Sequence, residues 1–254
     1  MFSGHELASS LLESSTTVLV RMPNKTLTID IVSVICEDLF MSRIQERRRE
    51  EKEMRRQSII DAAEQVFAQR GFEVATMADI ADQARLSRAL IYFYFKDKEE
   101  LALTITARGL QTLRRSFERA SAKCQTGLEK AAAISQAYMD FARSQPDYFE
   151  FISRGQVREF GPRPVRENER LCASEGEKTL AVLADAVRCG VTDGTIDPGV
   201  GDPVAVAVVL WGFIHGMLQV AASKQDMLEK VMHLDLADLW QGGLRLANRA
   251  IRAG

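Results

Sequence analysis

Residues 84–101, ARLSRALIYFYFKDKEEL, place four aromatic residues in a row, and a helix cannot bury all four on one side. If Ser87 caps the N-terminus of a helix, a rotation of about 100° per residue turns one set of side chains toward a core, namely Leu90, Ile91, Tyr94 and Phe95. The opposite side then carries Arg88, Ala89, Tyr92 and Phe93. We therefore expect this helix to expose one guanidinium group and two aromatic rings.

This outward set has the chemistry that recognises DNA. The Arg88 guanidinium can bind guanine edges or a phosphate, and the apolar rims of Tyr92 and Phe93 can contact thymine methyl groups. The tyrosine hydroxyl can reach a phosphate, while the small Ala89 lets the helix approach the groove floor. Taken alone, the same face is also compatible with ordinary exposed residues or a protein contact patch.

Two short helices separated by a tight break position this face. The segment TMADIADQA begins with Thr76 and Asp79 in a capping-box pattern, and the break comprises residues 85–87. The preceding SIIDAAEQVFAQRGF predicts a helix with Ile59, Ala63, Val66 and Phe67 on one stripe. We therefore predict a helix-turn-helix motif at residues 76–95.

The stretch TMADIADQARLSRALIYFYFKDKEEL resembles the DNA-binding domain of the TetR family of bacterial one-component repressors. The family pattern is matched at nine positions: Thr76, Ile80, Ala81, Ala84, Ser87, Tyr92, Phe95, Lys98 and Leu101. The resemblance covers residues 53–113 and implies that Thr76, Ser87, Tyr92 and Lys98 contact phosphates. It implies that Arg88, Ala89 and Phe93 face the bases of a palindromic operator in double-stranded DNA.

The sequence departs from the family pattern at three positions, where Arg85, Ala89 and Tyr94 replace Gly, Gly and His. A non-Gly residue with a left-handed backbone at position 85 would cost about 1–2 kcal/mol. These changes affect the expected operator sequence more than the family resemblance.

The 254 residues carry a net charge of −2, so any nucleic-acid binding must come from local patterning. The four cysteines lack zinc spacing and are expected to be free thiols in a reducing cytoplasm. The N-terminus lacks the pattern of a secretory signal. Residues 204–222 are uncharged and about as long as a membrane span, but His215 and Gln219 within them favour a buried helix of a soluble protein.

Residues 1–52 are expected to form an N-terminal extension, partly disordered or a product of a misassigned start. One hypothesis is that translation starts at Met41, and mass spectrometry of the native protein would test it. Residues 41–56 contain seven basic and four acidic side chains, a net charge of +3. We leave open whether this stretch is an arm that contacts DNA or a solvated helix with paired charges.

Residues 114–254 are expected to form a helical domain that binds an effector and dimerises. With the three-helix DNA-binding domain before it, the predicted fold class is all-α. Helices are expected at 127–144, 146–156, 165–189, 203–223 and 235–252. Aromatic residues suggest an effector pocket that includes Tyr138, Phe141, Phe151, Trp211 and His215. Close helix approach suggests a dimer interface at Gly212, Gly216, Leu239, Trp240 and Gly243. Each of these residues could equally belong to the core of one subunit.

The sequence contains no catalytic motif, and we expect neither a cofactor nor a metal site. The expected function is that of a cytoplasmic, homodimeric transcriptional regulator, a repressor released from DNA by a small-molecule effector. The alternatives are an activator or an effector-independent DNA-binding protein of the same fold, and a small-molecule-binding helical protein with an incidental helix-turn-helix.

Overall fold

The computed structural model describes residues 17–22, 25–155 and 167–254. The chain divides into two compact units, Met1–Asp61 and Ala62–Gly254. The helix α2, Ile31–Arg70, begins in the first unit and ends in the second.

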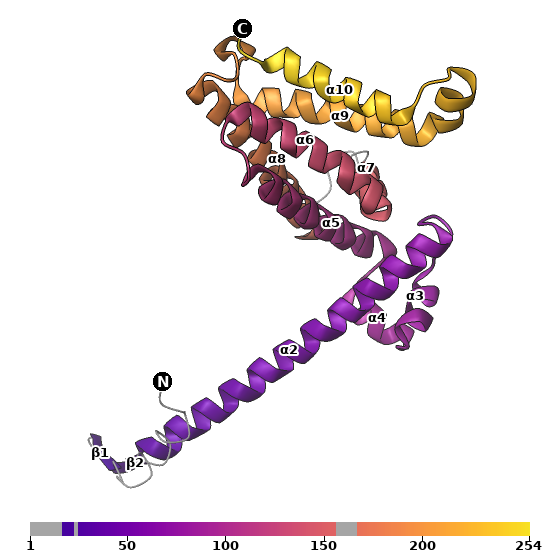
Figure 1. The fold of residues 1–254 in the computed structure, drawn as a ribbon. Helices are drawn as coiled ribbons and strands as arrows, with labels where there is room; N and C mark the ends of the chain where they lie inside the picture. The colour runs from indigo at the N-terminus through magenta and orange to yellow at the C-terminus, as the bar shows by residue number, and fades with distance from the viewer. Residues whose placement is uncertain (1–16, 23–24, 156–166) are drawn as a thin grey trace, which may run out of the picture. The chain divides into compact units, whose positions relative to one another are not determined.

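The first unit contains a two-stranded antiparallel hairpin of β1, Thr17–Met22, and β2, Lys25–Asp30 (Figure 1). Its register runs from Thr17 opposite Asp30 to Met22 opposite Lys25. Each strand contains three β-branched residues, which favour strands, whereas the residues IVSVI after Asp30 begin α2. The hairpin is the exception to the all-α prediction, which is confirmed for the two domains that follow.

The second unit continues with α3, Met77–Ala84, α4, Arg88–Tyr94, and α5, Lys98–Ser121. The predicted stripe on α2 is confirmed, because Ile59, Ala63, Val66 and Phe67 are all buried. The break between α3 and α4 falls at residues 85–87, as predicted.

Five longer helices follow: α6, Gly127–Ser144, α7, Pro146–Gly155, α8, Glu167–Asp193, α9, Pro203–Asp226, and α10, Leu236–Ile251. A 3-10 turn, η1, Pro198–Val200, precedes α9, and a π-helical turn, η2, Met227–Val231, follows it. Each helix lies within four residues of its predicted bounds. The expected break at residues 161–164 lies outside the described residues.

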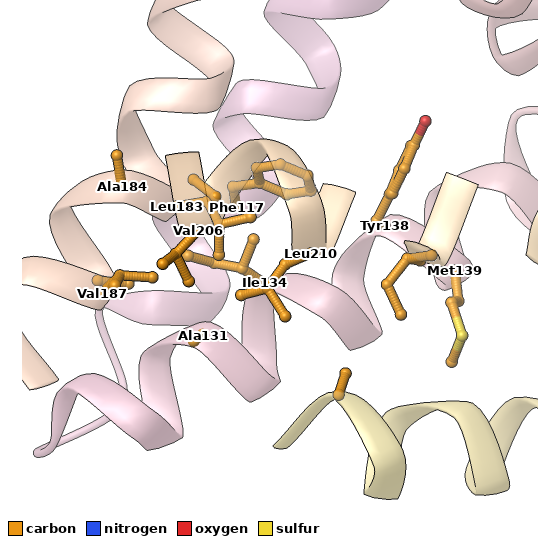
Figure 2. Packing of buried hydrophobic residues seen from close by; sticks show 14 of the residues in the cluster. Phe117, Ala131, Ile134, Tyr138, Met139, Leu183, Ala184, Val187, Val206 and Leu210 are labelled. Carbon is orange, nitrogen blue, oxygen red and sulfur yellow. The ribbon is translucent and has the colours of Figure 1, made fainter. Parts of the chain in front are cut away.

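The core of the C-terminal helical domain comes mainly from α5, α6, α8, α9 and α10. Figure 2 shows Phe117, Ile134, Leu183, Val206 and Leu210 packed together at its centre. Where α6 begins against α8, a Cβ atom on Gly127 would overlap the backbone of Gly190, so the two helices meet backbone to backbone.

Helix α9 was expected to be buried, but the structure buries only one of its faces. Val206, Ala207, Leu210, Ile214, Leu218 and Ala221 point inward, whereas Val208, Val209 and Phe213 are exposed. By length and composition, the segment Pro203–Val231 could span a membrane, and 39% of its apolar window is buried within the protein. Its buried face packs on α6, α8 and α10, as expected of a helix in a soluble domain.

Candidate DNA-binding and effector sites

Helix α3 begins with the predicted capping box. The Thr76 hydroxyl accepts a hydrogen bond from the Asp79 backbone N–H at 3.2 Å, and the Asp79 carboxylate accepts one from the Thr76 N–H at 3.0 Å. The same carboxylate accepts bonds from the Thr76 hydroxyl at 2.7 Å and from Arg70 at 2.6 Å. The bonds from Thr76 and the charge of Arg70 hold the pKa of Asp79 below its usual value.

Arg85 closes the C-terminus of α3 with a left-handed backbone, φ 54° and ψ 43°. The Leu86 N–H bonds the Ala81 carbonyl at 2.9 Å, and the Arg85 N–H bonds Asp82 at 3.1 Å. This is the closure that glycine usually provides at the end of a helix. Position 85 therefore has a left-handed backbone, which the glycine of the family pattern adopts without strain and an arginine does not.

Helix α4 exposes the predicted residues. Its N-cap is Ser87, whose hydroxyl accepts the Leu90 N–H at 3.3 Å. Ile91 and Phe95 are 0% and 1% exposed, while Tyr92 and Phe93 are 53% and 70% exposed. The face formed by Arg88, Ala89, Tyr92 and Phe93 is thus open to solvent, and we call it the α4 outer face.

The side chain of Lys98 contacts the turn after α2, and the sequence does not predict this contact. Its ammonium group donates to the carbonyls of Phe72, Glu73 and Ala75 at 3.0, 3.0 and 3.3 Å. It also lies 4.8 Å from the centre of the Phe72 ring. Lys98 therefore ties the turn after α2 to the start of α5, and its expected phosphate contact stays a prediction.

Three of the five residues expected at the effector pocket come together. The Tyr138 hydroxyl lies 2.7 Å from His215 Nδ1, and the two rings are stacked with centres 6.1 Å apart. The Trp211 ring is 5.5 Å from the His215 ring. Figure 2 shows the Tyr138 hydroxyl pointing away from the surrounding apolar side chains.

Phe117, Phe149 and Gln219 complete this group, which we call the aromatic–histidine cluster. Phe149 lies 5.4 Å from the His215 ring, and Phe117 lies 6.0 Å from Tyr138. Gln219 Nε2 is 3.3 Å from His215 Nε2. Gln219 lies one turn from His215, and Phe149 belongs to the aromatic-rich segment 137–155 from which the pocket is expected, so both were recognisable in the sequence. Phe117 lies on α5, and no sequence spacing connects it to His215.

Burial sets the protonation of the cluster. Removing the phenol from water raises the pKa of Tyr138 above its usual range, and burial lowers the pKa of His215. Tyr138 and Gln219 occupy the two nitrogens of the imidazole. The cluster therefore presents a neutral imidazole and a neutral phenol among aromatic rings.

The other two expected pocket residues lie elsewhere. Phe141 is 4% exposed and belongs to the core. Phe151 lies 5.6 Å from Phe67 and 6.5 Å from Phe72, which belong to the end of α2 and the turn that follows it. Phe151 thus joins α7 to the DNA-binding domain rather than to the cluster.

A polar contact accompanies this aromatic junction. The Tyr148 hydroxyl donates to Glu64 at 3.0 Å, and Arg108 pairs with the same carboxylate at 3.0 Å. Burial, with the negative charge of Glu64, raises the pKa of Tyr148 to about 12. Helix α7 consequently contacts the aromatic–histidine cluster through Phe149 and the DNA-binding domain through Tyr148 and Phe151.

The residues expected at the dimer interface divide into two groups. Gly212 and Gly216 are exposed on α9, and a Cβ atom at either position would meet no atom within 4 Å. Gly243 is buried, where a Cβ atom would overlap the end of Met217, so it permits α10 to pack on α9 within one chain. Leu239 and Trp240 are partly buried, and Trp240 packs against the core of its own chain.

Within the described ranges, no group of three or more His, Cys, Asp or Glu side chains could hold a metal ion. Cys124, Cys172 and Cys189 are free thiols, as expected.

Two family models match the chain. The model for bacterial regulatory proteins of the tetR family matches residues 59–105, and that for the tetracyclin repressor-like C-terminal domain matches residues 131–246. Together they match more than half of the 254 residues.

Curated relatives and solved structures agree with this assignment. The uncharacterized HTH-type transcriptional regulator YfiR of Bacillus subtilis (strain 168) is 34% identical over 73 residues, 29% of this chain and 36% of that protein. FadR from Bacillus subtilis in complex with stearoyl-CoA has a TM-score of 0.59 at 21% identity, covering 75% of this chain and 96% of that chain. AibR in complex with isovaleryl coenzyme A and operator DNA has a TM-score of 0.51 at 20% identity, covering 65% and 86%.

At 21% and 20% identity, the FadR and AibR structures show that this chain shares their fold. The chain spans 36%, 62% and 46% of the lengths of three curated relatives, all of them transcriptional regulators.

The α4 outer face on a helix-turn-helix, joined to a larger helical domain, defines a class of DNA-binding regulatory proteins. The chain belongs to the TetR family of that class.

Proposed function

We propose that this protein is a cytoplasmic, homodimeric transcriptional repressor that binds a palindromic operator and leaves it when a small-molecule effector binds. The α4 outer face is the observation that supports the proposal most directly. Tyr92 and Phe93 are exposed on the same helix whose Ile91 and Phe95 are fully buried. Exposing two adjacent aromatic rings leaves apolar surface in contact with water, and such a patch is typical of a face that meets a partner.

Dimerisation follows from the geometry of the operator. Two recognition helices bind half-sites one DNA turn apart only when two subunits associate. The exposed stripe of α9, with Val209, Gly212, Phe213 and Gly216, is the surface we assign to the second copy.

The aromatic–histidine cluster is the proposed effector site. Aromatic walls with a few polar groups are typical of small-molecule sites, and here the polar groups are Tyr138, His215 and Gln219. An effector that binds more tightly to the conformation unable to bind DNA would shift the equilibrium toward release. Helix α7, which contacts both the cluster and the DNA-binding domain, would carry the change.

The first experiment tests DNA recognition. Wild-type protein selects sites from a genomic fragment library by gel shift, and the affinities of Arg88→Ala and Tyr92→Ala for the selected site are then measured. We expect each substitution to weaken binding between about 10-fold and 100-fold, because a base or phosphate contact contributes about 1–3 kcal/mol. Arg119→Ala, which removes an exposed cation from α5, is the control and should bind as wild type does. Equal affinity in all four proteins would contradict the proposal.

A second experiment tests the effector. Thermal unfolding is measured with a metabolite panel that includes stearoyl-CoA and isovaleryl-CoA, the ligands of the two structural relatives. A compound that raises the melting temperature should also release the selected DNA, and His215→Ala should abolish both effects. A stabilising compound without effect on DNA binding would favour an effector-independent regulator.

A transcriptional reporter distinguishes the direction of regulation. Loss of the protein should raise expression from the selected site if the protein represses. A fall in expression would identify an activator.

A further inference from the structure

We propose that the aromatic–histidine cluster binds an uncharged aromatic compound that carries a hydrogen-bond acceptor, and that the Tyr138 hydroxyl donates to this acceptor. The inference rests on the proposed function, because it names the chemical class of the effector at the site proposed above. It concerns the ligand and the side chains that would hold it, and it does not depend on how DNA is bound.

The hydrogen bonds of the cluster have a definite direction. Gln219 Nε2 lies 3.3 Å from His215 Nε2. An amide nitrogen is a donor, so His215 Nε2 accepts this bond, and the single proton of the neutral imidazole lies on Nδ1. His215 Nδ1 then donates to the Tyr138 oxygen at 2.7 Å. The hydroxyl proton of Tyr138 is consequently left to bond another acceptor.

The position of Tyr138 restricts what that acceptor can be. The residue is 2% exposed, and Figure 2 shows its hydroxyl pointing away from the surrounding apolar side chains. Burial raises the pKa of Tyr138, and a hydrogen bond from the Trp211 indole N–H opposes this shift. The indole nitrogen is a donor and cannot accept the hydroxyl proton. Because a buried donor without an acceptor destabilises a protein, an acceptor on a ligand would be favoured here.

The rings of the cluster favour a flat ligand. The planes of the Tyr138 and Trp211 rings are inclined by 12° and 28° to the His215 plane. The Phe149 ring has its centre 5.4 Å from that of His215, at an angle of 48°. An aromatic ligand can stack in the offset manner that such rings prefer. Trp211, His215 and Phe149 are only partly buried, so a ligand can reach the rings from solvent.

The surroundings disfavour a charged ligand. Residues 204–223 of α9, which include Trp211, His215 and Gln219, contain no charged side chain. Burial alone lowers the pKa of His215, without a contribution from any charge among the described residues. A carboxylate or ammonium group on a ligand would therefore lose its water without gaining an opposite charge.

The test uses three probes of nearly the same shape. Methyl β-naphthyl ketone is neutral and carries an acceptor, β-ethylnaphthalene lacks the acceptor, and β-naphthoate adds a negative charge. Equilibrium dialysis without DNA measures the dissociation constant of each probe for wild type, Tyr138→Phe and Tyr148→Phe. The matched control is Tyr148→Phe, because it removes a tyrosine hydroxyl that bonds Glu64 and lies outside the cluster.

We expect wild type to bind the ketone about 10-fold more tightly than the hydrocarbon, which is the effect of one neutral hydrogen bond. Tyr138→Phe should lose this preference, whereas Tyr148→Phe should keep it. Naphthoate should bind about 100-fold more weakly than the ketone, because its charge is desolvated without a partner. The inference would be overturned by an equal preference in wild type and Tyr138→Phe, by naphthoate binding as tightly as the ketone, or by no binding of the ketone.

A second measurement does not depend on the Tyr138 variant. Long-range proton–nitrogen NMR correlations show which imidazole nitrogen carries the proton, and His215→Gln assigns the signals. We expect the proton of His215 on Nδ1. A proton on Nε2 would overturn the inference, because the Tyr138 hydroxyl would then donate to His215 instead of to a ligand.

Failure of the inference is distinguishable from failure of the proposed function, because neither measurement involves DNA. If the ketone binds as expected but leaves the selected DNA bound to the protein, release by this site fails and the inference stands. If a charged metabolite releases the DNA equally from wild type and Tyr138→Phe, the inference fails and the proposed function stands.

Discussion

At the scale of single residues, Arg85 has a backbone conformation that its Cβ atom disfavours. Its φ of 54° closes α3, and two backbone hydrogen bonds hold it there. A residue with a Cβ atom in this conformation costs about 1–2 kcal/mol, and the surrounding structure must supply that energy.

Arg85→Gly should therefore stabilise the protein. We expect the free energy of unfolding to rise by about 1 kcal/mol, since glycine adopts this conformation without strain. Urea denaturation measures the change. Arg85→Ala keeps the strained backbone and removes the same charge, so it should be no more stable than wild type, and a stabilised Arg85→Ala would contradict the explanation.

The second prediction concerns His215 and the pH dependence of the protein's stability. Burial lowers its pKa below the ordinary value of 6.5, so the unfolded chain takes up a proton at a higher pH than the folded protein does. The contribution of His215 to stability is complete above about pH 6.5. It is lost as the pH falls from there toward the lower pKa of His215 in the folded state.

The melting temperature should accordingly fall less between pH 7.5 and pH 5 in His215→Gln than in wild type. Differential scanning fluorimetry at several pH values checks this, and His233→Gln, at an exposed histidine, is the control. Parallel pH profiles for His215→Gln and wild type would show that the imidazole titrates as it would in water.

At the scale of elements, the contacts of Lys98 explain how the turn after α2 is held. Three carbonyls at residues 72–75 lack partners within a regular helix, and one ammonium group satisfies all three. The first residue of α5 thus fixes the approach to α3, and the helix-turn-helix depends on a side chain that follows it in the chain.

Lys98→Met should lower the free energy of unfolding by about 1–3 kcal/mol, because it leaves partly buried carbonyls without a donor. Chemical denaturation without DNA is the appropriate measurement, since a contact made only to phosphate would not affect it. Lys96→Met, at a neighbouring exposed lysine, serves as the control. Equal stability of Lys98→Met and wild type would leave phosphate binding as the role of this residue.

At the scale of the whole molecule, two glycines on neighbouring helices have opposite roles. Gly212 faces solvent on α9, whereas Gly243 lies where α10 packs on α9 of the same chain. A side chain at the first position finds open space within the subunit, and one at the second must displace Met217.

Gly212→Leu should leave the subunit folded but weaken the dimer, because it obstructs the close approach of a second α9. Sedimentation equilibrium should show a shift toward monomer with unchanged helix content. Gly243→Leu should instead lower the free energy of unfolding by about 1–3 kcal/mol through overpacking. A Gly212→Leu protein that remains as dimeric as wild type would place the interface elsewhere.

The sequence by itself determined the helices that follow α2, the capping box and the outward face of α4. These depend on local spacing, since a helix turns by a fixed angle at each residue and Thr76 and Ser87 cap helices within a few residues of themselves. The exposure of Tyr92 and Phe93 followed from the same geometry.

Only the tertiary structure decided which distant residues meet. It joined His215 to Tyr138 and Phe149, sent Phe151 to the DNA-binding domain, and buried Gly243 while exposing Gly212. Helical periodicity gives the direction of a side chain around its own axis, but the neighbour in that direction depends on how several helices pack together. The same limit applies to Lys98, whose partners lie more than twenty residues earlier in the chain.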